Sequence, residues 1–215
     1  ARHLAKKLGY IYIDTGSMYR AVTLFALQNN IISDDKFDKQ QLVDRLSEVN
    51  VRFEYQKEEN KNITFLNDVD IEDQIRGIEV SRFVSEISTL KAVRQHLVAL
   101  QRDLGAKKGI VMDGRDIGTV VFPKSELKVF LTASPQVRAE RRYKELKEKN
   151  LEVTMQDVLK NIMERDLIDQ SRKESPLKFA NDAILLDNSK LTIEDELHWI
   201  LNELENRGFI EGYER

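Results

Sequence analysis

The stretch I-V-M-D-G-R-D-I-G-T-V-V-F-P, residues 110–123, passes from an apolar run directly into polar and flexible residues. This pattern is typical of a buried parallel strand that ends at a binding crevice, because open α/β sheets bind ligands beyond the carboxyl ends of their strands. The competing interpretation is a β-hairpin, since Asp-Gly between apolar runs is a strong turn signal. In a hairpin, Arg115 and Asp116 would be an ordinary solvated tip. Taken alone, the stretch favours neither interpretation.

The composition bounds the class of protein. With 215 residues, of which 41% are hydrophobic and 33% charged, the chain can form one soluble domain, or one core with an inserted subdomain. No apolar stretch approaches the roughly 20 residues of a membrane span, and no signal peptide is visible. The absence of cysteine excludes disulfides and suits a cytoplasmic protein. A net charge of -3 provides no global basic field for nucleic acid. We therefore expect a cytoplasmic protein without nucleic-acid or membrane partners.

The first part of the chain predicts a helix, a strand and a second helix. Residues 1–8 form an amphipathic pattern that Gly9 would end as a C-cap glycine. Residues 10–13 are a short β-rich run, and Thr15 directly after it is expected to cap the next helix. A strand, a tight turn and a helix N-terminus can bind an anion. Arg20 would lie near that site, although a single arginine is more commonly a surface residue.

A hairpin then interrupts the alternation of strands and helices. A polar, helix-like segment and two alternating strands are expected, at 33–50, 51–55 and 63–69, with a charged tip at 56–62. Because a hairpin does not fit the alternation around it, we predict an inserted subdomain over 36–76. The core would then comprise 1–35 and 77–215.

A helix is predicted over 79–104, with an apolar face formed by Val80, Phe83, Val84, Ile87, Leu90, Leu97 and Leu100. Arg94 lies on the same face and must meet an acidic or anionic partner, because an unpaired buried charge is very costly. Ser85, nine residues earlier, would point about 180° away from Arg94 on one continuous helix. If both serve one ligand, the helix must break near 88–89, where Thr89 could be a new N-cap.

A second core strand is predicted at 128–132, followed by a helix that Ser134 and Pro135 would begin. This helix carries three arginines, which are Arg138, Arg141 and Arg142. Because it also carries several glutamates, one interpretation is a solvated surface helix. The functional interpretation is a mobile lid over 134–150 whose arginines reach phosphate.

A further helix over 154–172 begins with the capping box Thr154-x-x-Asp157. Its apolar stripe continues into three charged residues on the same face, namely Arg165, Asp169 and Arg172. A salt-bridged helix end accounts for Arg165 and Asp169, whereas Arg172 indicates an anion in a cleft. A last strand at 183–186 and a helix capped by Thr192 complete the chain. No metal-ligand spacing is present.

Together these motifs resemble the bacterial cytidylate kinases, a branch of the P-loop nucleoside monophosphate kinases. The matching pieces are D-T-G-S-M-Y-R at 14–20, the pair Ser85 and Arg94, D-G-R-D-I-G-T-V-V-F-P at 113–123, and E-R-D-L-I-D-Q-S-R at 164–172. The resemblance implies an α/β fold with a parallel five-stranded sheet flanked by helices, a small inserted α+β subdomain that binds the monophosphate, and a short helical lid. It also implies transfer of the γ-phosphoryl group of ATP, with Mg²⁺, to CMP or dCMP, which gives CDP or dCDP and ADP.

The resemblance implies a role for each candidate site residue. Ser85, Arg94 and Asp116 resemble the cytosine contacts; Thr15, Arg165 and Asp169 the ribose contacts; and Arg20, Arg115 and Arg172 the contacts of the acceptor phosphate. Arg138, Arg141 and Arg142 resemble lid arginines that approach the transferred phosphoryl group and, with Arg115 and Asp113, are the catalytic candidates. Whether Asp113 helps to organise magnesium stays open, and no protein ligand is assigned to the metal.

The chemistry of these residue types agrees with the resemblance. Phosphoryl transfer needs positioning and neutralised oxygens, and arginine pairs bidentately with phosphate without losing its charge. A carboxylate such as Asp116 can accept a hydrogen bond from the cytosine amino group, and Arg94 can donate to the carbonyl and ring nitrogen. Uracil presents a carbonyl in place of the amino group, so a buried Asp116 would reject it.

One feature of the family is absent from the printed sequence, which has no G-x-x-x-x-G-K-[ST] loop. Ala1 would fall just beyond that loop, so we expect that upstream residues are omitted. We also expect the printed chain to recognise CMP without phosphorylating it. The alternatives are another small P-loop kinase with UMP or AMP as acceptor, and a truncated, non-catalytic nucleotide-binding protein. ATP and CMP or dCMP are the expected partners of a monomer.

Overall fold

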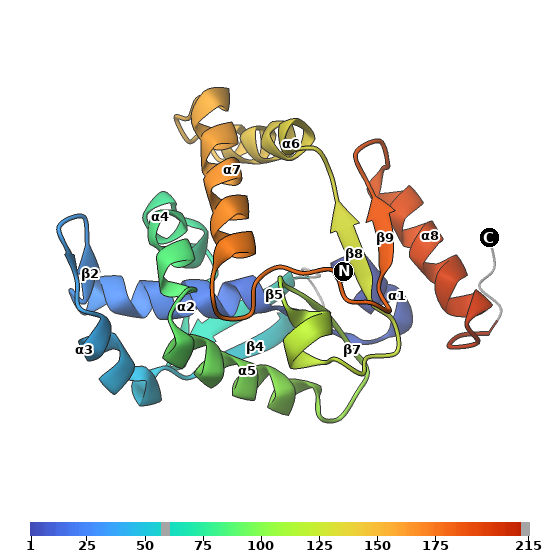
Figure 1. Ribbon diagram of the computed structural model, residues 1–215, viewed down its shortest axis with the longest axis horizontal. Helices are drawn as coiled ribbons and strands as arrows, with labels where there is room; N and C mark the ends of the chain where they lie inside the picture. Colours follow the sequence, from blue (N-terminus) through green and yellow to red (C-terminus); the bar gives the residue numbers. More distant parts are fainter. Residues whose placement is uncertain (57–60, 212–215) are drawn as a thin grey trace. The chain divides into compact units, whose positions relative to one another are not determined.

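The computed structural model describes residues 1–56 and 61–211, and the chain divides into two compact units. The first unit comprises Ala1–Ile117 and Arg172–Ser175, and the second comprises Gly118–Ser171 and Pro176–Arg215. Figure 1 shows the elements of both units, coloured from blue at the N-terminus to red at the C-terminus. The segment predicted to be an inserted subdomain, 36–76, lies in the first unit, and its status as a separate domain stays a prediction.

The first unit begins with α1 (Arg2–Leu8), β1 (Ile11–Asp14) and α2 (Thr15–Gln28). Gly9 ends α1 as predicted, at a φ of 67° that an L-residue adopts only with strain. β1 pairs in parallel with β7 (Ile110–Asp113). Because parallel neighbours require a long crossover connection, the hairpin interpretation of 110–123 is wrong. A short π-helical turn, Ile117–Val121, follows β7 instead.

The inserted segment (36–76) is mostly an antiparallel sheet. Its elements, together with the short strand before it, are β2 (Ile32–Ser33), β3 (Lys36–Phe37), α3 (Lys39–Asp44), η1 (Leu46–Glu48), β4 (Val51–Gln56), β5 (Lys61–Leu66), β6 (Val69–Asp70) and η2 (Gln74–Arg76). The predicted single strand over 63–69 is wrong, because Asn67 and Asp68 adopt positive φ values and turn the chain back. The central part of the predicted tip, 57–60, lies outside the described residues.

The single helix predicted over 79–104 is instead two helices. A break here is what a ligand shared by Ser85 and Arg94 would require. α4 spans Ile78–Ile87 and α5 spans Lys91–Gly105. Thr89 is not the new N-cap, since its hydroxyl donates to the Glu86 carbonyl at 2.7 Å and α5 begins without a side-chain cap. The buried faces of α2, α4 and α5 share one apolar core that includes Met18, Val22, Phe25, Val80, Ile87, Val93 and Leu97.

The second unit contains the parallel pair β8 (Val129–Thr132) and β9 (Ile184–Asp187), together with α6 (Pro135–Glu148), α7 (Met155–Ser171) and α8 (Ile193–Asn206). Ser134 caps α6 and Thr192 caps α8, as predicted. α6 and α7 pack around Ala139, Leu146 and Val158. The strands of the α/β core thus form two separate parallel pairs, so the predicted five-stranded sheet is not confirmed. Within the described ranges, no helix has the length and apolar character needed to cross a membrane.

Candidate functional site

Two carboxylates lie side by side where β1 and β7 end. Asp14 and Asp113 are paired residues in the register of the two strands. Asp14 also caps α2, because its carboxylate accepts from the Ser17 amide at 3.1 Å and from the Ser17 hydroxyl at 2.8 Å. The prediction that Thr15 caps this helix is therefore wrong. Thr15 is the first helical residue, and its Oγ1 donates across to the Asp113 carbonyl at 2.7 Å. The start of α2 is thus fixed to both strand ends.

The carboxyl group of Asp113 has a raised pKa that lies near neutral pH. Displacement of water by surrounding protein atoms, together with the negative charge of Asp14, raises the pKa of Asp113 to about 6. The Tyr12 hydroxyl, which donates to Asp113 Oδ2 at 3.0 Å, opposes this rise in pKa, as does the Arg115 guanidinium. Burial and the two carboxylates raise the pKa of Tyr12, so its hydroxyl stays protonated and remains a donor.

Arg76 holds the other carboxylate of this pair. Its Nη2 donates to Asp14 Oδ2 at 3.1 Å and to Glu72 Oε1 at 3.0 Å. Burial alone would raise the pKa of Asp14, but the charge of Arg76 and the hydrogen bonds from Ser17 and Arg76 outweigh burial and lower it. The sequence interpretation missed Arg76 and Glu72. Their only signal was an i,i+4 spacing, which is also typical of exposed surface pairs.

The predicted cytosine contacts include a buried ion pair. Arg94 is 3% exposed, and its Nη2 lies 2.5 Å from Asp116 Oδ2. The expectation that Arg94 requires an acidic or anionic partner is therefore confirmed. Its Nη1 donates to the Ser88 carbonyl at 3.0 Å, and its guanidinium lies over the Tyr19 ring. Arg94 Nε is buried and meets no acceptor in the described part of the chain. Ser85 lies on α4, the helix that precedes the one carrying Arg94.

The arginines predicted to bind the acceptor phosphate all belong to the first unit. Arg20 donates from Nη1 to Ser81 Oγ at 3.2 Å, which ties α2 to α4. Arg115 is exposed just after β7, where its charge acts on Asp113. Arg172 is 9% exposed and donates from Nε to the Ser175 carbonyl at 3.0 Å.

The predicted lid arginines have protein partners within the second unit. Arg138 makes a bidentate pair with Asp166, at 2.9 and 2.6 Å, which joins α6 to α7. Arg141 donates to the Asn188 carbonyl at 2.7 Å, and Arg142 pairs with Glu145 one turn along its own helix. Arg165 and Asp169, the predicted ribose contacts, lie on α7, where Asp169 is buried. The approach of these residues to a substrate stays a prediction.

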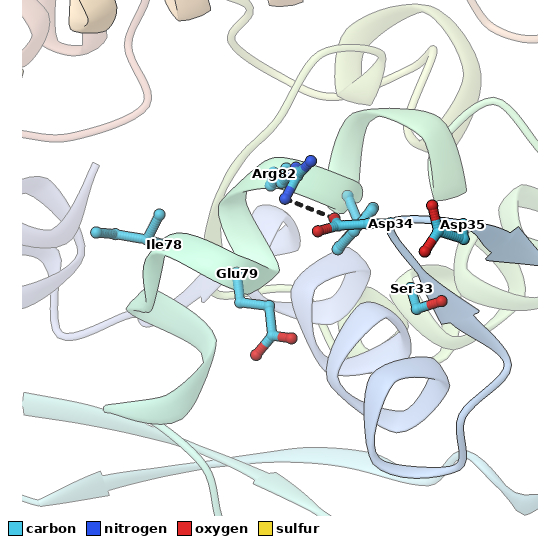
Figure 2. Close-up of a pocket in the computed structure, with 7 residues that line it drawn as sticks. Ser33, Asp34, Asp35, Ile78, Glu79 and Arg82 are labelled. Atoms are coloured by element: carbon cyan, nitrogen blue, oxygen red, sulfur yellow. Dashed lines mark ion pairs between the residues drawn. The ribbon is translucent and has the colours of Figure 1, made fainter.

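A cavity of about 470 Å³ lies elsewhere in the first unit, between the β2–β3 turn and α4. It is lined by Ser33, Asp34, Asp35, Ile78, Glu79, Arg82 and Phe83, and Asp34 and Arg82 form an ion pair there at 2.5 Å (Figure 2). None of the predicted site residues lines this cavity. Among the residues that the structure describes, no group of three or more histidine, aspartate or glutamate side chains could hold a metal ion.

An α/β chain with carboxylates and arginines where its parallel strands end has the features of an enzyme class that acts on phosphorylated ligands. The sequence model of one family, described as Cytidylate kinase, matches residues 1–206. Cytidylate kinases of Bacteroides fragilis and Parabacteroides distasonis are 51% and 49% identical over 203 residues, which cover 94% of this chain and 89% of each relative. That of Flavobacterium psychrophilum is 48% identical over 206 residues, covering 96% and 91%. The chain therefore belongs to the cytidylate kinase family, whose members are ATP-dependent phosphotransferases.

Proposed function

We propose that this protein transfers the γ-phosphoryl group of ATP to CMP or dCMP, giving CDP or dCDP and ADP. The observation that carries the proposal is the identity of about half of the residues, over 94% of the chain, to proteins named cytidylate kinase. Mg²⁺ would accompany ATP. In such sites most metal ligands are phosphate oxygens and water, with one or two carboxylates from the protein.

The Arg94–Asp116 pair supports cytosine as the base. Asp116 would accept a hydrogen bond from the cytosine amino group, and Arg94 would donate to the carbonyl and ring nitrogen, with Ser85 as the third contact. Because the two side chains are buried and hold each other in place, little orientation is left to be achieved when the base binds. A uracil carbonyl would face the Asp116 carboxylate, acceptor against acceptor, and binding would be penalised.

The arginines account for the phosphate chemistry. Arg20, Arg115 and Arg172 would neutralise the acceptor phosphate, while Thr15, Arg165 and Asp169 would contact the ribose. Arg138, Arg141 and Arg142 would approach the transferred group from a lid over 134–150, with Asp113 among the catalytic candidates. To reach phosphate, Arg138 would exchange the Asp166 carboxylate for phosphate oxygens, which present a similar bidentate geometry.

The finer features of the fold belong to the same proposal. The parallel pairing within each of the two strand pairs is compatible with a five-stranded parallel sheet. The inserted segment (36–76) would form the monophosphate-binding subdomain. We further propose a cytoplasmic monomer that binds neither nucleic acid nor membranes.

Replacement of Asp116 tests the choice of base. Asp116→Ala should weaken CMP binding by about 1.5–3 kcal/mol, the usual contribution of a hydrogen bond to a charged group, while UMP binding should change little or improve. Calorimetry with CMP and UMP measures both affinities, and the exposed Asp34, paired with Arg82, supplies the control Asp34→Ala. An unchanged CMP/UMP ratio in Asp116→Ala would refute the assignment.

Phosphoryl transfer itself is tested with the protein expressed from its complete coding sequence, by supplying ATP with CMP, dCMP, UMP or AMP. CDP and dCDP should form fastest. Equal rates with all four acceptors, or none with CMP, would contradict the proposed activity.

A further inference from the structure

A chain of hydrogen bonds runs from the inserted segment (36–76) to the start of α2. The hydroxyl of Thr64 on β5 donates to Glu72 Oε2 at 2.8 Å. Arg76 bridges the two carboxylates, at 3.0 Å from Glu72 Oε1 and 3.1 Å from Asp14 Oδ2, and its Nη2 also lies 3.3 Å from Ser17 Oγ. Asp14 then holds the Ser17 amide as the N-cap of α2. Four links therefore connect β5 with the first turn of that helix.

Burial makes this connection stronger than an exposed ion pair. Thr64 is 1% exposed and Glu72 is 7% exposed, while the side chains of Arg76 and Asp14 are 28% and 23% exposed. Partly buried, charge-assisted hydrogen bonds of this kind are stronger than fully exposed ones. Loss of one partner leaves the remaining charge uncompensated. A second link from the same segment reaches β1, where Asn62 Nδ2 donates to the Tyr12 carbonyl at 2.6 Å. The inserted segment thus contacts β1 at two residues, Tyr12 and Asp14.

The charge of Arg76 also matters for an anionic ligand. Asp14 is negative and occupies the N-terminus of α2, where the helix dipole and free amides would otherwise attract an anion. Asp113 adds a second carboxylate beside it. The guanidinium of Arg76 offsets the charge of Asp14 at the place where Thr15 begins the helix that carries Arg20. Without Arg76, a phosphate bound there would face the uncompensated carboxylate of Asp14.

We propose that Arg76 is a positioning residue of the acceptor site: it binds Asp14, holds the first turn of α2 in place, and offsets a negative charge that would repel the acceptor's phosphate. Arg76 acts through Asp14 and does not contact the acceptor. The inference rests on the proposed function, because it concerns the same site, but one of its two measurements needs no ligand.

The test compares Arg76→Gln with Arg52→Gln. Arg52 is a matched control because it lies in the same segment and also bridges two carboxylates, those of Glu54 and Asp68, at a more exposed position. Calorimetry with CMP and with cytidine separates phosphate binding from nucleoside binding. Arg76→Gln should weaken CMP binding by about tenfold and cytidine binding much less, as expected for lost charge compensation. Arg52→Gln should match the wild type for both.

The measurement without ligand is hydrogen exchange of the Ser17 amide. It should speed up in Arg76→Gln, because Asp14 loses the partner that holds it against this amide, and stay unchanged in Arg52→Gln. Unchanged exchange in Arg76→Gln, or equal losses of CMP and cytidine affinity, would overturn the proposal. If the wild type bound neither ligand, the proposed function would fail, whereas the exchange measurement would still decide the role of Arg76.

A double-mutant cycle shows whether Arg76 acts through Asp14. If it does, adding Arg76→Gln to Asp14→Asn should change CMP affinity by less than twofold, and additive effects would contradict this route. Arg76→Lys covers the case in which Arg76→Gln does not fold. Lysine keeps the charge but lacks the second donor with which Arg76 is fixed, since Arg76 Nε also donates to Glu72 Oε1 at 3.2 Å. Ser17 exchange should therefore rise less than in Arg76→Gln, while the preference for CMP over cytidine is largely retained. A Lys variant that loses this preference would contradict the offset of charge by Arg76.

Discussion

At the scale of single residues, most of the charged side chains of the candidate site are paired with other protein groups. Arg94 and Asp116 form a buried ion pair, and Arg76 forms ion pairs with both Asp14 and Glu72. Buried ion pairs contribute little net stability, because desolvation offsets most of the attraction. Their value here is orientation, since a guanidinium held by a carboxylate presents its remaining donors in a fixed direction.

The two carboxylates at the strand ends should respond oppositely to pH. Asp113 has a folded-state pKa of about 6, above its ordinary value of 3.8, so its contribution to stability is full below about pH 4 and is lost as pH rises through 6. Asp113→Asn should therefore gain stability relative to the wild type between pH 4 and 7, with no further gain above pH 7. Urea unfolding at several pH values measures this difference.

Asp14→Asn is the opposite control. The pKa of Asp14 is lowered in the folded protein, so its contribution is present at neutral pH and lost as pH falls below its ordinary range. This variant should be less stable than the wild type at pH 7, with a gap that narrows in acid. Parallel pH curves for the two variants would contradict the opposite environments of these carboxylates.

At the scale of elements, close packing around the end of β7 depends on one glycine. A Cβ atom added to Gly114 would lie 2.4 Å from Thr15 Oγ1 and 2.8 Å from Ile117 Cδ1. Thr15 cannot simply turn away, because its hydroxyl is bonded to the Asp113 carbonyl. The absence of a side chain therefore lets the loop after β7 approach the start of α2.

Gly114→Ala should destabilise the protein by about 1–3 kcal/mol, the usual cost of overpacking, and should weaken CMP binding because Thr15 and Arg115 flank the change. Urea unfolding and calorimetry measure the two effects. Gly77→Ala is a milder comparison, since its added Cβ would lie 3.2 Å from its nearest atom, the Gln74 carbonyl oxygen, a tight contact that a small shift relieves. Equal stability losses in the two variants would show that the approach at Gly114 is not critical.

At the scale of the whole molecule, one short segment belongs to the first unit although it follows much of the second unit in the sequence. Arg172–Ser175 belongs to the first unit, although the residues on both sides of it belong to the second. Glu174 in this segment lies 4.0 Å from Lys91 at the start of α5. A candidate phosphate contact, Arg172, is thereby supplied to the unit that holds Arg20 and Arg115.

Arg172→Lys should weaken CMP binding while leaving cytidine binding unchanged, because a point charge cannot reproduce the bidentate fork that arginine presents to phosphate. Calorimetry with both ligands measures the difference. Arg82→Lys, in the exposed pair with Asp34, is the matched control and should behave as the wild type. Equal losses for CMP and cytidine would identify Arg172 as a structural residue.

Much of the local structure could be predicted from short patterns. The C-cap at Gly9 and the caps at Ser134 and Thr192 depend on residues a few positions apart. The motifs that resemble cytidylate kinases were also visible, and the family match over residues 1–206 confirms that resemblance. The error at 63–69 arose because Asn67 and Asp68 were counted within an alternating strand, although both tolerate the left-handed backbone of a turn.

The sequence by itself determined that Arg94 needs an acidic or anionic partner, because the cost of an unpaired buried charge does not depend on the fold. Only the tertiary structure decided that the partner is Asp116, 22 residues away, and that Arg76 reaches Asp14 across 62 residues. It also decided between the crossover and the hairpin after residue 110. These choices depend on which strands become neighbours, and hydrophobic periodicity and capping patterns carry no information about strand order.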